Sequence, residues 1–570
     1  MGFTNETWQS KAAAKRAAIL DSIPKEWRLS PAQLKLTEGW RDITGPFIQQ
    51  FLNDDEVAIV SLDSMPIVQA IRTGKLSAVQ VTRAFCKTAA IAHQINPCLL
   101  EFFPDIALSR AEELDNYQQA TGRSMGPLHG LPVSLKDQFH VKGVDTSMGY
   151  VGWIGGNYGV LDDSQAHQVQ SQVTEELLSV GAVLYCKTSL PQTVYFGETD
   201  NHILGTTYNP HNRNLSCGGS SGGEGTLHAL RAGTLGIGTD IGGSVRIPAA
   251  FCGTFSLKPT PERLSFRDCA NTAPGQYTCR CTIGVMGTSL DGVRLGFKAL
   301  LSTQPWIKDP AVVPIPYRQD IFNAYSSRGS GAAARPLKVG VFWNDGVVEP
   351  HPPVRRGLRL LAESIKNAGH KIVNWNPPSH TEGCKVHLRM LIADGLYDIH
   401  QQLARSGEPL IPGIAEQLKL QEPRPLLEVH DLTLKKLAYE IKYSDYWNST
   451  AADDGQIVDA VIMPVAPHAA VIPGKFYHVQ YTHIVNALNY SAAVIPVTKA
   501  DQSVDTVDTT YEPRNDIDRL NWDAYDPEVY HGAPVGLQIV GGKFEEEKVL
   551  AIASVIYAAL LKEKHGVESA

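Results

Sequence analysis

The sequence predicts an α/β protein built as one large domain, and three observations support this. Short apolar, β-rich segments alternate with helical segments along most of the chain, a pattern typical of α/β proteins. The 570 residues are 43% hydrophobic and 19% charged, so the chain can bury a large core. The alternation continues on both sides of the small, polar segment 324–335, and we find no internal repeat, which favours one domain over two.

The first 65 residues are predicted to form an N-terminal helical extension. Residues 4–22 are good helix formers and end before a proline. Residues 24–65 are mixed in composition and interrupted by further prolines, so we expect no core element there. The main domain should therefore span residues 66–565, and Ser77 is a suitable N-cap for its first helix.

The main domain should contain a series of buried strands separated by helices. Segment 324–335 (AYSSRGSGAAAR) is expected to be a flexible surface loop, and residues 380–450 should be mainly helical. Apolar, β-rich runs predict strands at 130–135, 183–190, 234–239, 336–343, 371–377, 459–467, 491–498 and 534–542. Further helices are predicted near 165–180, 224–232, 353–368 and 545–562.

Charge and hydropathy argue against two classes of partner. The net charge is −8, and no block of Lys or Arg could follow a phosphate backbone, so we expect no nucleic-acid binding. No run of 18 apolar residues occurs, so we expect no membrane span. The N-terminus lacks the basic start and apolar run of an export signal, which predicts a cytoplasmic protein.

The cysteines point to the same compartment. Nine of them, an odd number, are scattered over a long chain, which indicates reduced thiols. The densest group, Cys269, Cys279 and Cys281, has no CxxC pair and no histidine at zinc-finger spacing. We therefore expect no metal site there.

Glycine and serine are most concentrated at 216–225 (SCGGSSGGEG), in front of a predicted helix. A phosphate could bind such a segment, but neither GxxxxGK[ST] nor GxGxxG is present, so nucleotide binding is disfavoured. The segment also fits G-x-S-x-G with Ser221 at its centre, as in a nucleophile elbow. An elbow follows a strand, whereas residues 209–218 (NPHNRNLSCG) are interpreted as a loop.

A second serine has a more suitable setting. The strand predicted at 234–239 runs into Asp240, so Ser244 should lie on a loop beyond its carboxyl end, where α/β sheets bind ligands. The loop between them is Ile241, Gly242 and Gly243, and its N–H groups, with that of Ser244, could converge on an oxyanion. Asp240 is a weak base with a reference pKa of about 3.9, so we interpret it as an anchor of this loop.

Two kinds of base could serve Ser244. His129 and His140 flank the strand at 130–135, so a Ser–His pair is conceivable. Lys136 lies at the carboxyl end of the same strand, and a neutral, desolvated lysine beside serine hydroxyls can also remove a proton. Spacing alone does not decide between them.

These segments carry a resemblance to a known family. GGSSGGEG (218–225), GIGTDIGGSVRIPAAFCG (236–253) and LKPT (257–260) resemble the amidase signature family, and so do GPLHGLPVSLKD (126–137) and HGAPVGLQIVG (531–541). The likeness covers roughly residues 66–560, and within the family the chain is similar to fungal acetamidases, the general amidases. The resemblance implies one α/β/α domain around a mixed, mainly parallel sheet.

The resemblance also implies a set of catalytic residues. Ser244 matches the family's nucleophile and Lys136 its base. Ser220 matches the serine that bridges them, with a cis peptide bond to Gly219, and Ser221 matches a serine that forms a hydrogen bond near the lysine. The positions that match the oxyanion loop are Ile241, Gly242, Gly243 and Ser244.

The implied activity is hydrolysis of a carboxamide to a carboxylic acid and ammonia through an acyl-enzyme, with no metal and no organic cofactor. Small aliphatic or aryl monocarboxamides are the expected substrates, and segments 191–200 and 275–285 are expected to line the acyl pocket. Two alternatives remain open: a biosynthetic amidase or acyltransferase of secondary metabolism that uses the same triad, and an amidotransferase subunit that depends on a partner chain. A homodimer is possible.

Overall fold

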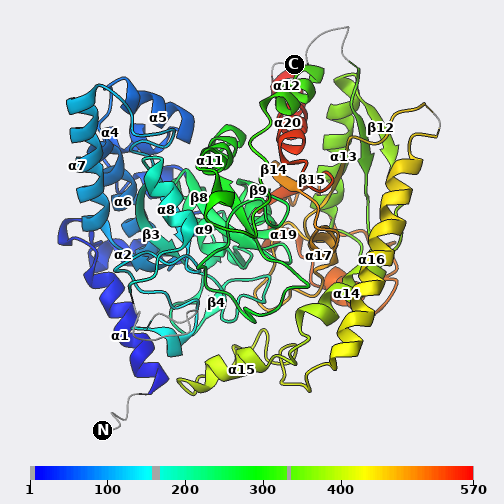
Figure 1. The fold of residues 1–570 in the computed structure, drawn as a ribbon, viewed down its shortest axis with the longest axis horizontal. Coiled ribbons are helices and arrows are strands. Elements are labelled where there is room, and N and C mark those ends of the chain that lie inside the picture. Colours follow the sequence, from blue (N-terminus) through cyan, green and yellow to red (C-terminus); the bar gives the residue numbers. More distant parts are fainter. Residues whose placement is uncertain (1–6, 157–166, 330–334, 453, 569–570) are drawn as a thin grey trace.

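The structure, a computed structural model, describes residues 7–156, 167–329, 335–452 and 454–568. A large sheet runs through the middle of the molecule (Figure 1). The strands are β1 (Leu99–Phe102), β2 (Pro132–Lys136), β3 (Val183–Thr188), β4 (Asp200–Asn201), β5 (Gly205–Thr206), β6 (Tyr208–Asn209), β7 (Asn212–Ser216), β8 (Leu235–Asp240), β9 (Phe255–Lys258), β10 (Thr282–Gly287), β11 (Lys338–Val341), β12 (Lys371–Asn374), β13 (Ala460–Pro464), β14 (Ala492–Lys499) and β15 (Pro534–Val540).

The large sheet has eleven strands within the described residues, in the order β1-β3-β2-β8-β10-β9-β14-β15-β13-β11-β12. It is mixed, as predicted, but it is not mainly parallel. The parallel neighbours are β2-β3, β2-β8, β11-β12 and β11-β13, and the other six neighbouring pairs are antiparallel. One reason is that segment 259–281, which joins β9 to the adjacent β10, contains no helix, so the chain turns back beside itself.

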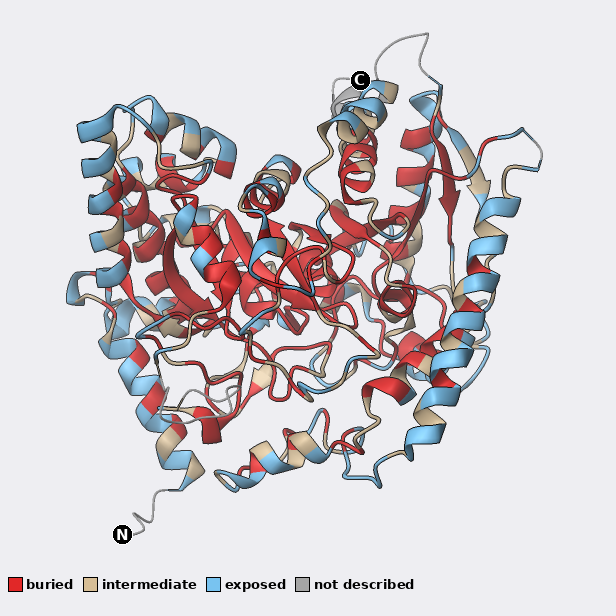
Figure 2. Cartoon of the chain, viewed as in Figure 1, coloured by how far each residue is buried: buried red, intermediate tan, exposed pale blue. Residues whose placement is uncertain are grey.

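Helices cover both faces of the sheet. In β15, Val535 lies against α13, since a Cβ on Gly357 of α13 would be 3.0 Å from it. The next residue, Gly536, lies against Ala250 of α10, and a Cβ there would be 2.5 Å from the Cα of Ala250. Because successive residues of a strand point to opposite faces, α13 and α10 lie on opposite faces. The predicted α/β/α arrangement is confirmed, and its central strands are buried (Figure 2).

The helices have the following bounds. They are α1 (Trp8–Asp21), α2 (Pro31–Thr37), α3 (Pro46–Gln49), α4 (Asp54–Val60), α5 (Ser64–Arg72), α6 (Ala78–Ile95), α7 (Pro104–Thr121), α8 (Gln172–Ser179), α9 (Gly222–Ala229), α10 (Arg246–Cys252), α11 (Leu290–Ser302), α12 (Gln319–Ser326), α13 (Pro352–Asn367), α14 (His380–Leu391), α15 (Tyr397–Ala404), α16 (Leu426–Ser449), α17 (Gln480–Ala487), α18 (Asp516–Asp523), α19 (Pro527–Tyr530) and α20 (Glu546–Glu568).

The segment expected to be an extension is helical and packs on the main domain. Helices α1 to α4 lie within it. Trp27, Ile43 and Ile48 are buried in one apolar cluster with residues of α6, α7 and β3. The division of the chain at residue 65 stays a prediction, because a shared cluster neither requires nor forbids it.

Local sequence patterns correctly predicted most of the strands in the large sheet of the main domain. Ser77 caps α6, and its side chain and that of Gln80 form a reciprocal capping box. Each of the eight predicted strands overlaps a strand of the large sheet. The prediction did not identify β1, β9 and β10, which are short or follow irregular segments.

Segment 324–335 differs from the expected loop in its first half. Helix α12 continues to Ser326, and a 3₁₀ turn covers Ser327–Gly329. Residues 330–334 lie outside the described residues, as do residues 157–166, which include the first two residues of the helix predicted near 165–180. The observed helix in that region begins at Gln172.

Candidate active site

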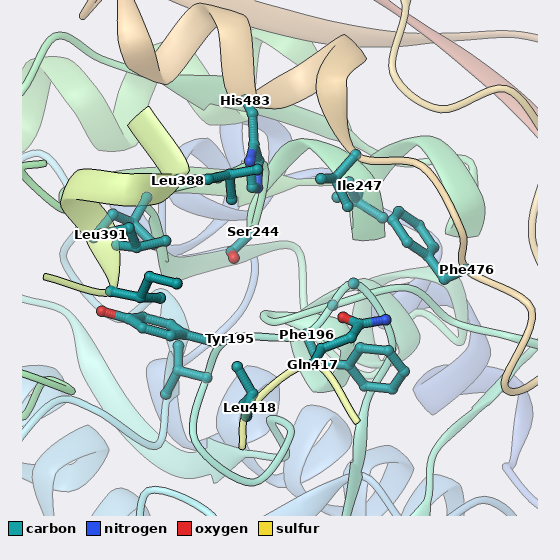
Figure 3. A pocket seen from close by; sticks show the side chains of 17 residues that line it. Tyr195, Phe196, Ser244, Ile247, Leu388, Leu391, Gln417, Leu418, Phe476 and His483 are labelled. Atoms are coloured by element: carbon teal, nitrogen blue, oxygen red, sulfur yellow. The ribbon is translucent and has the colours of Figure 1, made fainter. Parts of the chain in front are cut away.

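Ser244 lies where strand β8 gives way to helix α10. The strand ends at Asp240, and the helix begins at Arg246, so a five-residue loop carries the serine. The side chain of Ser244 is almost buried, with 7% of its surface exposed, and it lines a cavity (Figure 3). A molecule bound in the cavity can therefore reach its hydroxyl, as well as Ile241 and Gly242 of the same loop.

Asp240 holds the loop in place. One oxygen of its carboxylate accepts hydrogen bonds from the Gly243 N–H (2.8 Å) and Asn486 Nδ2 (2.9 Å), and Arg246 donates to both oxygens at 2.9 and 3.0 Å. Burial alone would raise the pKa of Asp240, but Arg246 holds it well below its usual range. Asp240 is thus a permanently charged anchor, as its low reference pKa suggested.

Gly243 is required by the shape of the loop. Its φ is +133°, and a Cβ there would lie 2.5 Å from Thr482 Oγ1. The Gly243 N–H is used by Asp240, so the N–H groups of Ile241, Gly242 and Ser244 remain as candidate oxyanion donors.

Lys136 reaches this region from the end of β2. Its Nζ is 2.7 Å from Ser220 Oγ and 2.8 Å from Thr239 Oγ1, and both Lys136 and Ser220 are fully buried. Burial lowers the pKa of Lys136 to about 7, although more distant acidic groups oppose this. A lysine with this pKa is partly neutral at physiological pH and can accept a proton.

Ser220 and Ser221 join the two loops. The Gly219–Ser220 peptide bond is cis, as the family resemblance implies. The Ser221 N–H donates to the Ser244 carbonyl at 3.0 Å, and Ser221 Oγ donates to the Thr239 carbonyl at 3.4 Å. The structure thus brings Lys136, Ser220, Ser221 and the Ser244 loop together.

The residues before Ser221 were misinterpreted as a loop. Strand β7 covers Asn212–Ser216 and pairs with β6. It belongs to a two-stranded ribbon outside the large sheet. A strand in the main sheet, which the nucleophile elbow requires, does not precede Ser221.

The two histidines form contacts of their own. His129 Nδ1 accepts from the Met125 N–H at 3.0 Å, and His140 Nδ1 is 3.0 Å from Thr146 Oγ1. Among the described residues, Lys136 is the titratable side chain that forms a hydrogen bond with Ser220. This geometry favours the lysine over the histidines as the base.

A cavity of about 330 Å³ opens above Ser244. Most of its lining is apolar or aromatic. Segment 191–200 contributes to it, as predicted, whereas segment 275–285 does not line it. The lining residues are Val194, Tyr195, Phe196, Gly197, Gly219, Ile241, Gly242, Ser244, Ile247, Leu388, Leu391, Ile392, Gln417, Leu418, Phe476, Val479 and His483.

Comparison with known proteins assigns the family. The family model described as Amidase matches residues 80–550. The chain belongs to the amidase family. It is 40% identical over 551 residues to an acetamidase of Aspergillus oryzae, a match that covers 96% of this chain and 98% of that one. It is also 38% identical to Amidase 1 of Gibberella moniliformis, over 89% of this chain and 94% of that one.

The amidase has the same fold as a related protein of known structure. A fatty acid amide hydrolase superposes with a TM-score of 0.87 and 30% identity, covering 97% of this chain and 95% of that one. The predicted fold class and the prediction of an amide-hydrolysing enzyme are therefore confirmed.

Several cavity residues of the amidase were not foreseen. Leu388 and Leu391 come from α14, Phe476 and Val479 precede α17, and His483 lies on α17. In the sequence, the apolar residues among them do not differ from core residues and His483 stands in no motif, since only the tertiary fold places these side chains near Ser244. No local motif could have identified them.

Other classes of site are not evident in the described part of the amidase. It contains no group of three or more His, Cys, Asp or Glu side chains placed to hold a metal ion. All nine cysteines are free thiols. Among its described helices, none is both long and apolar enough to cross a membrane.

Proposed function

We propose that this amidase hydrolyses carboxamides through an acyl-enzyme on Ser244, with Ser220 as the bridging group and Lys136 as the base. One observation carries the proposal: Lys136 Nζ lies 2.7 Å from Ser220 Oγ, both fully buried, beside the loop that presents Ser244 to the cavity. A partly neutral lysine joined to a serine by a hydrogen bond is a base that can act at neutral pH.

In the proposed steps, each proton that a residue takes up is later returned. Neutral Lys136 takes the proton of Ser220 as Ser220 takes that of Ser244, and Ser244 Oγ attacks the amide carbon. The attack forms a tetrahedral intermediate. The proton returns along the same path to the leaving nitrogen, so that the C–N bond breaks, ammonia departs and the acyl group remains on Ser244 as an ester. Water then attacks the ester with the same help, which releases the acid and restores Ser244. No cofactor is needed in any step.

Backbone N–H groups are proposed to stabilise the oxyanion. Those of Ile241, Gly242 and Ser244 belong to a loop that Asp240 fixes before the substrate arrives. Such preorganised donors act strongly, and losing one typically costs about 10²–10³ in rate. Gly243 and Ser221 support this site: Gly243 through its bond to Asp240, and Ser221 through its bond to the Ser244 carbonyl.

The cavity suggests the substrate class. Its volume of about 330 Å³ is near the lower end of the ~300–1,000 Å³ usual for small-molecule sites, and its walls are largely apolar. Small aliphatic or aryl monocarboxamides fit such a site. The names of the relatives, acetamidase and fatty acid amide hydrolase, agree with an uncharged acyl group.

A labelling experiment tests the nucleophile. A fluorophosphonate probe should label the purified wild type, and Ser244→Ala should lose both the label and the turnover of benzamide. Ser256→Ala is the matched control, because Ser256 is also buried and its hydroxyl has no hydrogen-bond partner in the described chain. Labelling of Ser244→Ala at the wild-type level would reject the assignment.

The compartment and the assembly of the amidase stay predictions. We propose a cytoplasmic enzyme on the basis of its scattered free thiols. Imaging of a fluorescent fusion tests the compartment, and light scattering tests whether the enzyme is a homodimer.

A further inference from the structure

Within the described residues, four polar side chains line the cavity: Tyr195, Ser244, Gln417 and His483. The hydroxyl of Tyr195 is fully buried and does not reach the open space. Gln417 is exposed at the protein surface. With Ser244 assigned as nucleophile, His483 is the polar side chain inside the cavity that the proposed mechanism does not use.

His483 is held against the loop that carries Ser244. Its neighbour Thr482 donates from Oγ1 to the Gly242 carbonyl at 2.6 Å, and Asn486, one turn later on α17, donates to Asp240 at 2.9 Å. A Cβ on Gly242 would lie 2.5 Å from His483 Nε2. Figure 3 shows the imidazole extending from α17 toward Ser244.

The two ring nitrogens of His483 differ in their surroundings. Nδ1 is buried without a hydrogen-bond partner, whereas Nε2 has no partner in the described chain and is not among the buried atoms. Burial, with smaller contributions from nearby His387 and Arg246, lowers the pKa of His483 to about 3, so the ring is neutral. A buried orphan N–H is rarer than a buried lone pair, so the proton belongs on Nε2.

Within the described residues, no hydrogen-bonding partner competes for the ring of His483. His387 packs edge-on against it with ring centroids 5.7 Å apart, but Nε2 of His387 is 3.2 Å from the Ile241 carbonyl and is used there. His483 Nε2–H is therefore a fixed hydrogen-bond donor in a largely apolar wall, close to the reacting carbonyl.

We propose that His483 is a specificity-determining residue: its Nε2–H donates a hydrogen bond to an oxygen on the acyl group, near the carbonyl carbon. The amidase should then favour carboxamides with such an acceptor over plain alkyl amides, because an alkyl chain leaves the donor unpaired. This inference rests on the proposed function, since it requires the acyl group to occupy this cavity.

Three amides of equal length test the proposal. Hexanamide is the apolar reference, and 2-propoxyacetamide and 3-ethoxypropanamide carry one ether oxygen in place of its third or fourth carbon. The measurement is the ratio of kcat/KM for each ether to that for hexanamide. Comparing this ratio between variants cancels the intrinsic reactivity of the ethers.

For at least one ether, the ratio should be about 3–10-fold higher in the wild type than in His483→Leu, as expected for one neutral hydrogen bond. His483→Gln keeps a side-chain donor and should retain part of the preference. Phe476→Leu alters an apolar part of the wall and should keep the wild-type ratio. Circular dichroism shows whether His483→Leu folds. If it does not, the ratio in the wild type is compared with the ratios in His483→Gln and His483→Ala.

The outcomes separate this inference from the proposed function. If hexanamide is hydrolysed but the ratio for each ether is the same in the wild type and in His483→Leu, the proposed role of His483 is overturned and the proposed function is not. Hexanamide hydrolysis by Ser244→Ala at the wild-type rate would overturn the proposed function instead. A wild type that hydrolyses none of the three amides would contradict both.

Discussion

Replacing Lys136 with methionine should abolish most of the activity and remove the pH dependence that the lysine causes. Lys136→Met keeps the length of the side chain but removes the only titratable partner of Ser220 among the described residues. General-base catalysis typically contributes about 10²–10⁴-fold, so kcat/KM should fall by that factor. Activity should recover in part at high pH, where hydroxide can replace the base.

The pH profile of the wild type follows from the pKa of Lys136, which burial lowers from 10.5 to about 7. The reactive form is the neutral amine, so kcat/KM should rise with pH and level off above about 7. At pH 5 only about one hundredth of the lysine is neutral, which predicts about a 100-fold lower kcat/KM than on the plateau.

The same shift has a measurable effect on stability. Because the folded-state pKa lies below the unfolded value, the fold disfavours the charged lysine, at about 5 kcal/mol for the whole shift. The free energy of unfolding is therefore lower by about this amount below pH 7, and it increases as the pH rises from about 7 to 10.5. Lys136→Met removes the penalty and leaves the Ser220 hydroxyl unpaired, at about 1–3 kcal/mol, whereas Thr239 Oγ1 keeps its bond to Gln138 Oε1 at 2.6 Å. The variant should therefore be at least as stable as the wild type at pH 7.

The assay is initial-rate hydrolysis of benzamide between pH 5 and 10, with thermal melts at each pH. Lys258→Met is the matched control: Lys258 is also buried with its pKa lowered to about 7, but it donates to backbone carbonyls of Pro259 and Tyr490 instead of to a serine. The control should keep the wild-type profile. A wild-type kcat/KM that is flat from pH 5 to 7, or a Lys136→Met rate within tenfold of wild type, would refute the reasoning.

Three further predictions concern the loop and the acyl-enzyme. Gly243→Ala should reduce kcat at least tenfold, because its Cβ would lie 2.5 Å from Thr482 Oγ1 at a φ of +133°; a wild-type kcat in steady-state assays would contradict this. Asp240→Asn should destabilise the fold by about 3–5 kcal/mol, since it leaves Arg246 buried without its counter-charge, and urea unfolding measures the loss. Hydroxylamine should trap the acyl group of Ser244 as a hydroxamate. If simple amines trap it faster than water at millimolar concentration, the enzyme is an acyltransferase.

The parts of the site that follow from local rules could be predicted from the sequence. The position of Ser244 follows from a strand that ends at Asp240 and from the two glycines, Gly242 and Gly243, that precede the serine. The anchoring role of Asp240 follows from its low reference pKa. The pairing of Lys136 with Ser220 does not follow from spacing, because it depends on how the end of β2 and the glycine-rich segment before α9 meet in the fold.

Long-range pairing also explains what the sequence did not predict. The expectation of a mainly parallel sheet was wrong: parallel neighbours need a crossover connection, while β9 and β10 are joined without a helix. The cavity wall was missed for a similar reason. Leu391 and Phe476 are ordinary apolar residues in the sequence, and they meet above Ser244 only through the packing of α14 and the segment before α17.

Two lysines near the site show how the fold keeps one of them available as a base. Asp137 directly follows Lys136 in the chain, and a free carboxylate there would favour the charged form of Lys136. Instead, Asp137 pairs with Lys187 at 2.7 Å and accepts from Ser147 and Met148. Among the described residues, the hydrogen-bond partners of Lys136 are two hydroxyl groups, which stabilise its charge far less than a carboxylate would. Because Asp137 is paired with a second lysine, burial can lower the pKa of Lys136 into the range where it can act as a base.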